Sequence, residues 1–154
     1  MRAPVITSNS GGSTANISYA ENGSSAVTTV TSTDVDASST ATYSLSGTDA
    51  DDFSINSSTG ILSFSSTPNY EAPTDDGENN NYVVEVQVSD GINMDTQTIT
   101  VIVNNTNEFT PVITSNGGDN TASISMDENI STVTTVTSTD EDGISTATYS
   151  KSGT

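Results

Sequence analysis

The stretch Pro4-Val5-Ile6-Thr7-Ser8-Asn9 recurs as Pro111-Val112-Ile113-Thr114-Ser115-Asn116, an offset of 107 residues (111 − 4). The block VTTVTSTD that begins at Val27 recurs unchanged from Val133, at an offset of 106 (133 − 27), so one residue has been lost between the two blocks. A period of this length is too long for a solenoid unit and matches a β-sandwich domain of about 100 residues. We therefore predict one complete module at residues 4–110 and the first part of a second, truncated module at residues 111–154, within a longer tandem array.

Apolar residues within the first module follow the two-residue period of β-strands. Tyr82, Val84, Val86 and Val88, and likewise Ile99, Val101 and Val103, alternate with positions expected to be polar or less buried. Shorter candidate strands lie at 27–33, 42–45, 53–55 and 61–64. Gly60 separates two of these candidates and suits a turn with positive φ. No stretch shows a helical apolar stripe, so the pattern predicts an all-β, Greek-key, immunoglobulin-like sandwich of about seven strands. The predicted core residues are Val30, Phe53, Ile55, Val84, Val86, Ile99 and Val101.

The charge balance excludes several classes of partner and site. The chain has 20 Asp and Glu residues against 2 Lys and Arg, for a net charge of −18. Such a surface repels nucleic acids and anionic membranes, and no apolar run reaches the roughly 20 residues of a membrane span, so direct membrane insertion is not expected. Histidine and cysteine are absent, which removes His-based catalytic triads, the usual zinc sites and disulfides. A bound cation is therefore expected to neutralise and stabilise the folded chain.

Short acidic motifs follow one another along the module in a fixed order. They are Ala20-Glu21-Asn22, Asp34-Val35-Asp36, Asp52-Phe53-Ser54-Ile55 with Thr59-Gly60-Ile61, Pro68-Asn69-Tyr70-Glu71, Ser89-Asp90-Gly91 and Asn105-Thr106-Asn107-Glu108-Phe109-Thr110-Pro111. The second module repeats Glu128-Asn129 and Asp140-Glu141-Asp142. This series resembles the cadherin repeat, and its richness in Ser, Thr and Asn resembles the repeats of large bacterial surface or secreted adhesins.

The resemblance implies Ca²⁺ at the linkers between successive modules. For the linker within this chain it implies the ligands Glu21, Glu71, Asn105, Asn107, Glu108, Asp140 and Asp142. It also implies that Asp34, Asp36 and Asp90 serve a preceding linker, so that their site is incomplete here. Carboxylates, amides and carbonyls are the hard oxygen donors that Ca²⁺ requires. Asn69 and Asn105 stand where the family usually carries Asp, which lowers the expected number of ions or their affinity.

Ordinary structural roles compete with each of these assignments. Asp-x-Asp at a strand end is often a turn former, although its recurrence in both modules favours ligation. The acidic loop at residues 74–81 is predicted to be solvated, and Asp49, Asp51 and Asp52 to form a turn. The tyrosines are predicted to pack in the core rather than to form a sugar-binding platform. These tyrosines are Tyr19, Tyr43, Tyr70 and Tyr82.

Three functions remain open on the sequence. The first is a Ca²⁺-rigidified extender in a secreted or cell-surface adhesin, whose partners are the neighbouring repeats. The second is a ligand-binding module for a polysaccharide or for a second copy of the protein. The third is a glycosidase, which needs two carboxylates facing a cleft, whereas the carboxylates here lie at strand ends and are copied into the next repeat. We therefore expect an extracellular, non-enzymatic repeat.

Overall fold

The computed structural model describes residues 2–36 and 40–153, and it divides into a first unit, Met1–Asn105, and a second unit, Thr106–Thr154. The strands of the first unit are β1 (Val5–Ile6), β2 (Thr14–Ala20), β3 (Thr28–Thr29), β4 (Ser32–Thr33), β5 (Thr42–Ser46), β6 (Phe53–Ile55), β7 (Ile61–Phe64), β8 (Asn81–Ser89) and β9 (Met94–Asn104). The second unit contains β10 (Val112–Ile113) and β11 (Ser138–Thr139). Three short 3-10 segments, η1 (Asn9–Gly11), η2 (Ala50–Asp52) and η3 (Ser115–Gly117), are the only helical elements among the described residues. Among residues 2–36 and 40–153, no helix is long and apolar enough to span a membrane.

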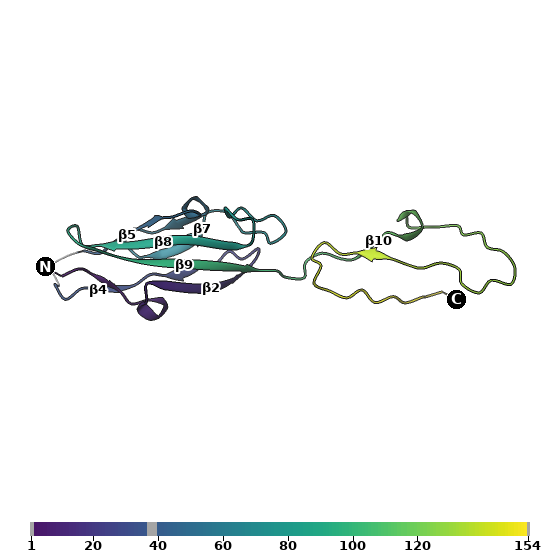
Figure 1. The fold of residues 1–154 in the computed structure, drawn as a ribbon, viewed down its shortest axis with the longest axis horizontal. Helices are drawn as coiled ribbons and strands as arrows, with labels where there is room; N and C mark the ends of the chain where they lie inside the picture. The colour runs from purple at the N-terminus through teal and green to yellow at the C-terminus, as the bar shows by residue number, and fades with distance from the viewer. Residues whose placement is uncertain (1, 37–39, 154) are drawn as a thin grey trace. The chain divides into compact units, whose positions relative to one another are not determined.

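The first unit is a sandwich of two sheets (Figure 1). One sheet has the order β2-β9-β8-β5, in which β2 runs parallel to β9 and the other pairs are antiparallel. The other sheet has the order β3-β7-β6, and β1 pairs with β4 beside it. Because β1 and β2 are two parts of one strand that changes sheets, and β3 and β4 are parts of another, the sandwich has the seven strands predicted. β2 was not among the strands predicted from sequence, although Ala15, Ile17 and Tyr19 alternate along it.

The core lies between the two sheets and follows the predicted alternation. Tyr82, Val84, Val86 and Val88 of β8 are at most 1% exposed, and alternate residues of β9 are buried in the same way. The prediction is confirmed for six of the seven core residues, while Ile55 is only partly buried. Each fully buried aliphatic side chain contributes about 1.5–3 kcal/mol to folding.

Three of the four tyrosines pack as predicted, and each buried hydroxyl has a hydrogen-bond partner. The Tyr19 hydroxyl donates to Ser25 O at 2.7 Å, and the Tyr82 hydroxyl accepts from Thr74 N at 3.1 Å. The Tyr43 hydroxyl pairs with that of Ser32 at 3.0 Å. Tyr70 differs, because it is 37% exposed.

Two buried carboxylates organise the acidic loop that was predicted to be solvated. Asp75 is 2% exposed, and its carboxylate accepts hydrogen bonds from Asn79 N and Asn80 N, both at 3.0 Å. Asp49 is also buried and accepts from Asp76 N at 2.8 Å and from Val83 N at 2.6 Å. The prediction is wrong at Asp75 and Asn80, which are both buried. Backbone amides replace the water that the Asp75 carboxylate loses, and the Asn80 side chain donates to Tyr70 O at 2.9 Å.

We expect the substitution Asp75→Ala to lower the free energy of unfolding by about 2 kcal/mol, because it leaves two loop amides without their acceptor. Asp76→Ala removes the same charge from an exposed neighbour and is expected to change stability by less than about 0.5 kcal/mol. Urea unfolding of the two variants measures the difference, and equal losses would contradict the role assigned to Asp75.

Candidate metal centre

Glu21 directly follows β2 and is held by main-chain contacts on two sides. Its amide donates to Asn104 O at 3.1 Å, which extends the β2–β9 ladder by one residue. Its carboxylate oxygen Oε2 accepts from Tyr70 N at 2.8 Å, and the residue is 3% exposed. Because the backbone fixes both ends of the residue, the carboxylate has a defined position at the end of the sheet.

Glu71 lies in the loop after β7 and is placed by a tight turn at Asn69. The Asn69 side-chain oxygen accepts from Glu71 N at 2.8 Å and from Ala72 N at 3.2 Å. Asn22 N donates to Pro68 O at 2.9 Å, which ties this loop to the segment that carries Glu21. The Asn that stands at the family's usual Asp position is therefore engaged as a turn former.

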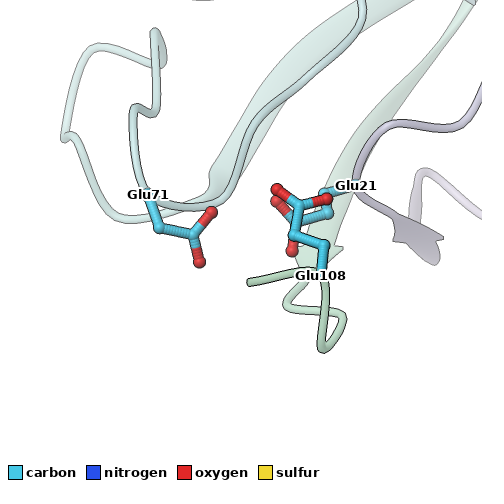
Figure 2. A group of neighbouring side chains, drawn as sticks. All are labelled: Glu21, Glu71 and Glu108. Atoms are coloured by element: carbon cyan, nitrogen blue, oxygen red, sulfur yellow. The ribbon is translucent and has the colours of Figure 1, made fainter. Parts of the chain in front are cut away.

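These contacts bring the carboxylates of Glu21 and Glu71 together (Figure 2). One carboxylate oxygen of each lies within 4.8 Å of the other, which corresponds to a repulsion of about 3 kcal/mol at an effective dielectric of about 20. Arg2 is the only Lys or Arg in the sequence of the first unit. Arg2 lies just before β1, and β1 contacts the start of β9 at Asp95. Asn104 is at the other end of this 11-residue strand, about 30 Å from Asp95. The pair therefore has the donors and the negative charge of a cation site.

The linker residues continue directly from this end of β9. Asn105 is partly buried, whereas Asn107 and Glu108 are exposed. Glu108, which is also drawn in Figure 2, is three residues after Asn105, so its Cα lies within about 11 Å of the Asn105 Cα in any orientation of the two units.

Asp140 and Asp142 form a turn in the second unit that also holds the linker. Asp142 N donates to Asp140 Oδ1 at 3.3 Å, and Asp142 itself is 5% exposed. The Asp142 oxygen Oδ2 accepts from Glu108 N at 3.1 Å and from Phe109 N at 2.8 Å. Asp140 and Asp142 therefore do act as turn formers. A carboxylate has about four acceptor positions, so this role is compatible with binding a cation as well.

Asp34, Asp36 and Asp90 lie at the opposite end of the first unit. Asp36 N donates to Asp34 Oδ1 at 2.9 Å, the same turn as in the second unit, and Arg2 N donates to Asp36 Oδ2. Within residues 2–36 and 40–153 these three carboxylates do not form a close group of the kind a metal requires.

Asp90 forms a turn at the end of β8. Hydrogen bonds from Asn93 N, at 2.6 Å, and from Ile92 N, at 2.7 Å, hold the pKa of the Asp90 carboxyl below its usual value. Because the charged form is favoured in the folded state, this contribution to stability is present at neutral pH and is lost as the pH falls below about 4.

Comparisons with known proteins agree with this architecture. The family model named Cadherin domain matches residues 14–104. The comparison with curated proteins gave no match.

Among solved structures, human protocadherin-24 EC1-2 (form II) is 23% identical with a TM-score of 0.67, and the alignment covers 92% of this chain and 63% of that one. Drosophila N-cadherin EC1-4 is 19% identical with a TM-score of 0.69, covering 91% and 34%. Mouse cadherin-23 EC22-24 is 16% identical with a TM-score of 0.68, covering 92% and 45%. This chain therefore spans less than two thirds of each of these structures, and at such identities the likeness shows the fold.

The family match covers the strands from β2 to β9, which are all of the sandwich except β1. Cadherin repeats pair with neighbouring repeats and in adhesive dimers. The chain therefore belongs to the cadherin-domain family, whose modules are extracellular, calcium-binding adhesion repeats without enzymatic activity.

Proposed function

We propose that this chain is a calcium-rigidified repeat that acts as an extender in a large secreted or cell-surface adhesin, of the kind found in bacteria. The observation that carries the proposal is the close pair of Glu21 and Glu71 carboxylates at the end of the sandwich, far from Arg2. A divalent cation converts the repulsion of this pair into attraction. Bound at a linker, the cation fixes the next module to the end of the sheet.

The chain supplies a donor set that fits Ca²⁺. The proposed ligands are Glu21, Glu71, Asn105, Asn107, Glu108, Asp140 and Asp142. All of them offer hard oxygen atoms, and Ca²⁺ accepts 6–8 such ligands in flexible geometry. Connectivity alone keeps Asn105, Asn107 and Glu108 near the Glu21–Glu71 pair. Because two members are neutral amides, we expect fewer ions or weaker binding than in a linker made only of carboxylates.

Asp34, Asp36 and Asp90 are proposed to be the corresponding half-site for a preceding module. They lie at the other end of the first unit, where β4 and β8 end. Their turn at Asp34–Asp36 is repeated at Asp140–Asp142, which supports one shared role for the two Asp-x-Asp motifs. Residues 4–110 and 111–154 would then be successive modules of one array.

Replacing Glu71 tests the assignment of the metal centre. We expect Glu71→Gln to weaken calcium binding by about tenfold or more, since ligand charge largely sets the affinity of calcium sites. Isothermal titration calorimetry measures the change. Glu78→Gln makes the same charge change at an exposed position of the same unit and is expected to leave the affinity within about twofold, because exposed charges are screened. Equal effects of the two substitutions would place the ion elsewhere.

The alternative function is a binding module for a polysaccharide or for a second copy of the protein. The exposed Tyr70 beside the metal centre is the specific feature that favours it, because an exposed aromatic ring can stack on a sugar. A glycan array with and without calcium separates the two functions. The extender predicts no glycan binding, whereas saturable binding that is lost in Tyr70→Ala would support the alternative.

A further inference from the structure

Asn80 is buried at the end of the first unit that also carries Glu21. It directly precedes β8, and Val103 N of β9 donates to the Asn80 carbonyl oxygen at 2.9 Å. On the other side of β9, Glu21 N donates to Asn104 O. Asn80 and Glu21 therefore flank the last residues of the same strand. The exposed fraction of Asn80 is 8%, so its side-chain amide needs partners within the protein.

The backbone around Asn80 fixes the direction of this side chain. Asn80 has a φ of 63°, a left-handed conformation that Asn tolerates better than most residues. The buried Asp75 carboxylate holds that conformation, because it accepts from Asn79 N and Asn80 N, both at 3.0 Å. The acidic loop thus presents the Asn80 amide in a defined position.

Two hydrogen bonds connect the Asn80 amide to Glu21. Asn80 Nδ2 donates to Tyr70 O at 2.9 Å, and Tyr70 N donates to Glu21 Oε2 at 2.8 Å. The Tyr70 carbonyl oxygen and the Glu71 nitrogen belong to one planar peptide unit. Glu71 N donates to Asn69 Oδ1 at 2.8 Å, so Asn80 and Asn69 hold the two sides of this peptide unit.

This peptide unit links the two carboxylates of the metal centre. The amide before it anchors Glu21, and the residue after it is Glu71. The two carboxylates lie within 4.8 Å of each other and repel, so a loose peptide unit would let them separate. A neutral amide restrains this segment without adding a further negative charge.

We propose that Asn80 is a positioning residue of the calcium centre, which holds the Tyr70–Glu71 peptide in the orientation that keeps Glu71 beside Glu21. This inference rests on the proposed calcium function and assigns it a residue outside the proposed ligand set. The acidic loop then supports the metal centre. Because coupling between two sites is reciprocal, bound calcium stabilises the loop in return.

The competing role for Asn80 is direct ligation of calcium. Its Oδ1 atom is buried and has no hydrogen-bond partner among residues 2–36 and 40–153, and an amide oxygen is a donor that Ca²⁺ accepts. The geometry favours positioning, because the atom that contacts Tyr70 is the amide nitrogen, which donates a hydrogen bond and does not bind Ca²⁺.

A double-mutant cycle on the full chain, measured by calcium titration calorimetry, tests the positioning role. Asn80→Gly keeps a residue that accepts positive φ and removes the amide, and it is expected to weaken calcium binding by about tenfold. In the Glu71→Gln background the same substitution is expected to cost at most about twofold, because the carboxylate that Asn80 positions is already replaced. Equal losses in the two backgrounds would show a general structural role and overturn the proposal.

Asn56→Gly is the matched control for loss of an amide side chain. The Asn56 side-chain oxygen accepts from Ser58 N and Thr59 N, both at 3.0 Å, in the turn between β6 and β7. No printed contact joins that turn to Glu21 or Glu71, so the substitution is expected to lower stability and to leave calcium affinity within about twofold. A tenfold loss in this control would mean that destabilisation alone weakens binding, and would overturn the proposal.

A charge-matched pair separates positioning from ligation. Asn80→Asp cannot donate to Tyr70 O, whereas Asn79→Asp adds the same charge next to it and keeps the oxygen that accepts from Asn81 N. We expect Asn80→Asp to bind calcium at least about fivefold more weakly than Asn79→Asp. Equal or tighter binding by Asn80→Asp would overturn the positioning role, because a ligand oxygen gains affinity from added charge.

Amide hydrogen exchange of the unsubstituted chain tests the same coupling without any variant. Calcium is expected to slow exchange at Asn79 N and Asn80 N at least about fivefold more than at Ser58 N and Thr59 N, and equal slowing overturns the proposal. If the unsubstituted chain binds no calcium, the proposed function fails and this inference fails with it. If Glu71→Gln weakens binding and Asn80→Gly does not, only this inference fails.

Discussion

The substitution Gly60→Ala is expected to destabilise the first unit by about 3 kcal/mol, and so to lower its melting temperature by about 15 °C. Gly60 has a φ of 72°, and a Cβ there would lie 2.1 Å from the carbonyl oxygen of Val30. That carbonyl belongs to the short segment between β3 and β4, and Val30 N donates back to Gly60 O at 2.8 Å. The clash is with backbone on both sides, so a side-chain movement cannot relieve it.

Gly91→Ala separates this clash from simple backbone strain. Gly91 also has a positive φ, of 92°, but a Cβ there would have no heavy atom within 4 Å. Its substitution should therefore cost only the conformational term of about 1–2 kcal/mol. Thermal melts of both variants in the same calcium concentration give the comparison. If the two variants have the same melting temperature, the close approach of Gly60 to Val30 does not contribute to stability.

Removing calcium should have the second large effect. With calcium at about 100 times its dissociation constant, binding to the folded chain adds about 2.7 kcal/mol to the free energy of unfolding, which raises the melting temperature of a domain of this size by about 10–20 °C. The physical reason is that the carboxylates of Glu21 and Glu71 repel each other when no cation lies between them.

The measurement is a thermal melt in calcium and in EDTA, with the ionic strength matched by sodium chloride. The matched salt separates specific binding from screening of the net charge of −18. The same melt of Glu71→Gln should show a smaller difference between the two conditions. An identical melting temperature of the unsubstituted chain in calcium and in EDTA would contradict a stabilising metal.

The sandwich was predictable wherever a strand has one buried and one exposed face. Val84, Val86, Ile99 and Val101 alternate with residues that are polar or less buried, and that period of two holds in the structure. Gln97 has the same parity as Ile99 and is fully buried, so its position in the pattern was a readable signal of a buried amide. The positive φ of Gly60 was also predicted, because a turn between two short strands calls for it.

Residues whose role depends on long-range contacts were not predictable. In sequence, a buried Asp in a polar loop cannot be told from a solvated one. Asp49 and Asp75 differ from solvated Asp residues only in the backbone amides that donate to their carboxylates. The approach of Glu21 to Glu71 likewise depends on the Asn69 turn and on the Asn22–Pro68 contact, neither of which has a local periodicity. The family resemblance, rather than spacing, brought these two carboxylates into one proposed site.

The most direct test of the calcium centre is an anomalous difference map from crystals grown with calcium. We expect a calcium peak at about 2.3–2.6 Å from carboxylate oxygens of both Glu21 and Glu71. Further ligands should come from Asn105, Asn107 and Glu108. A map with no peak between Glu21 and Glu71, or with calcium only at Asp34, Asp36 and Asp90, would contradict it.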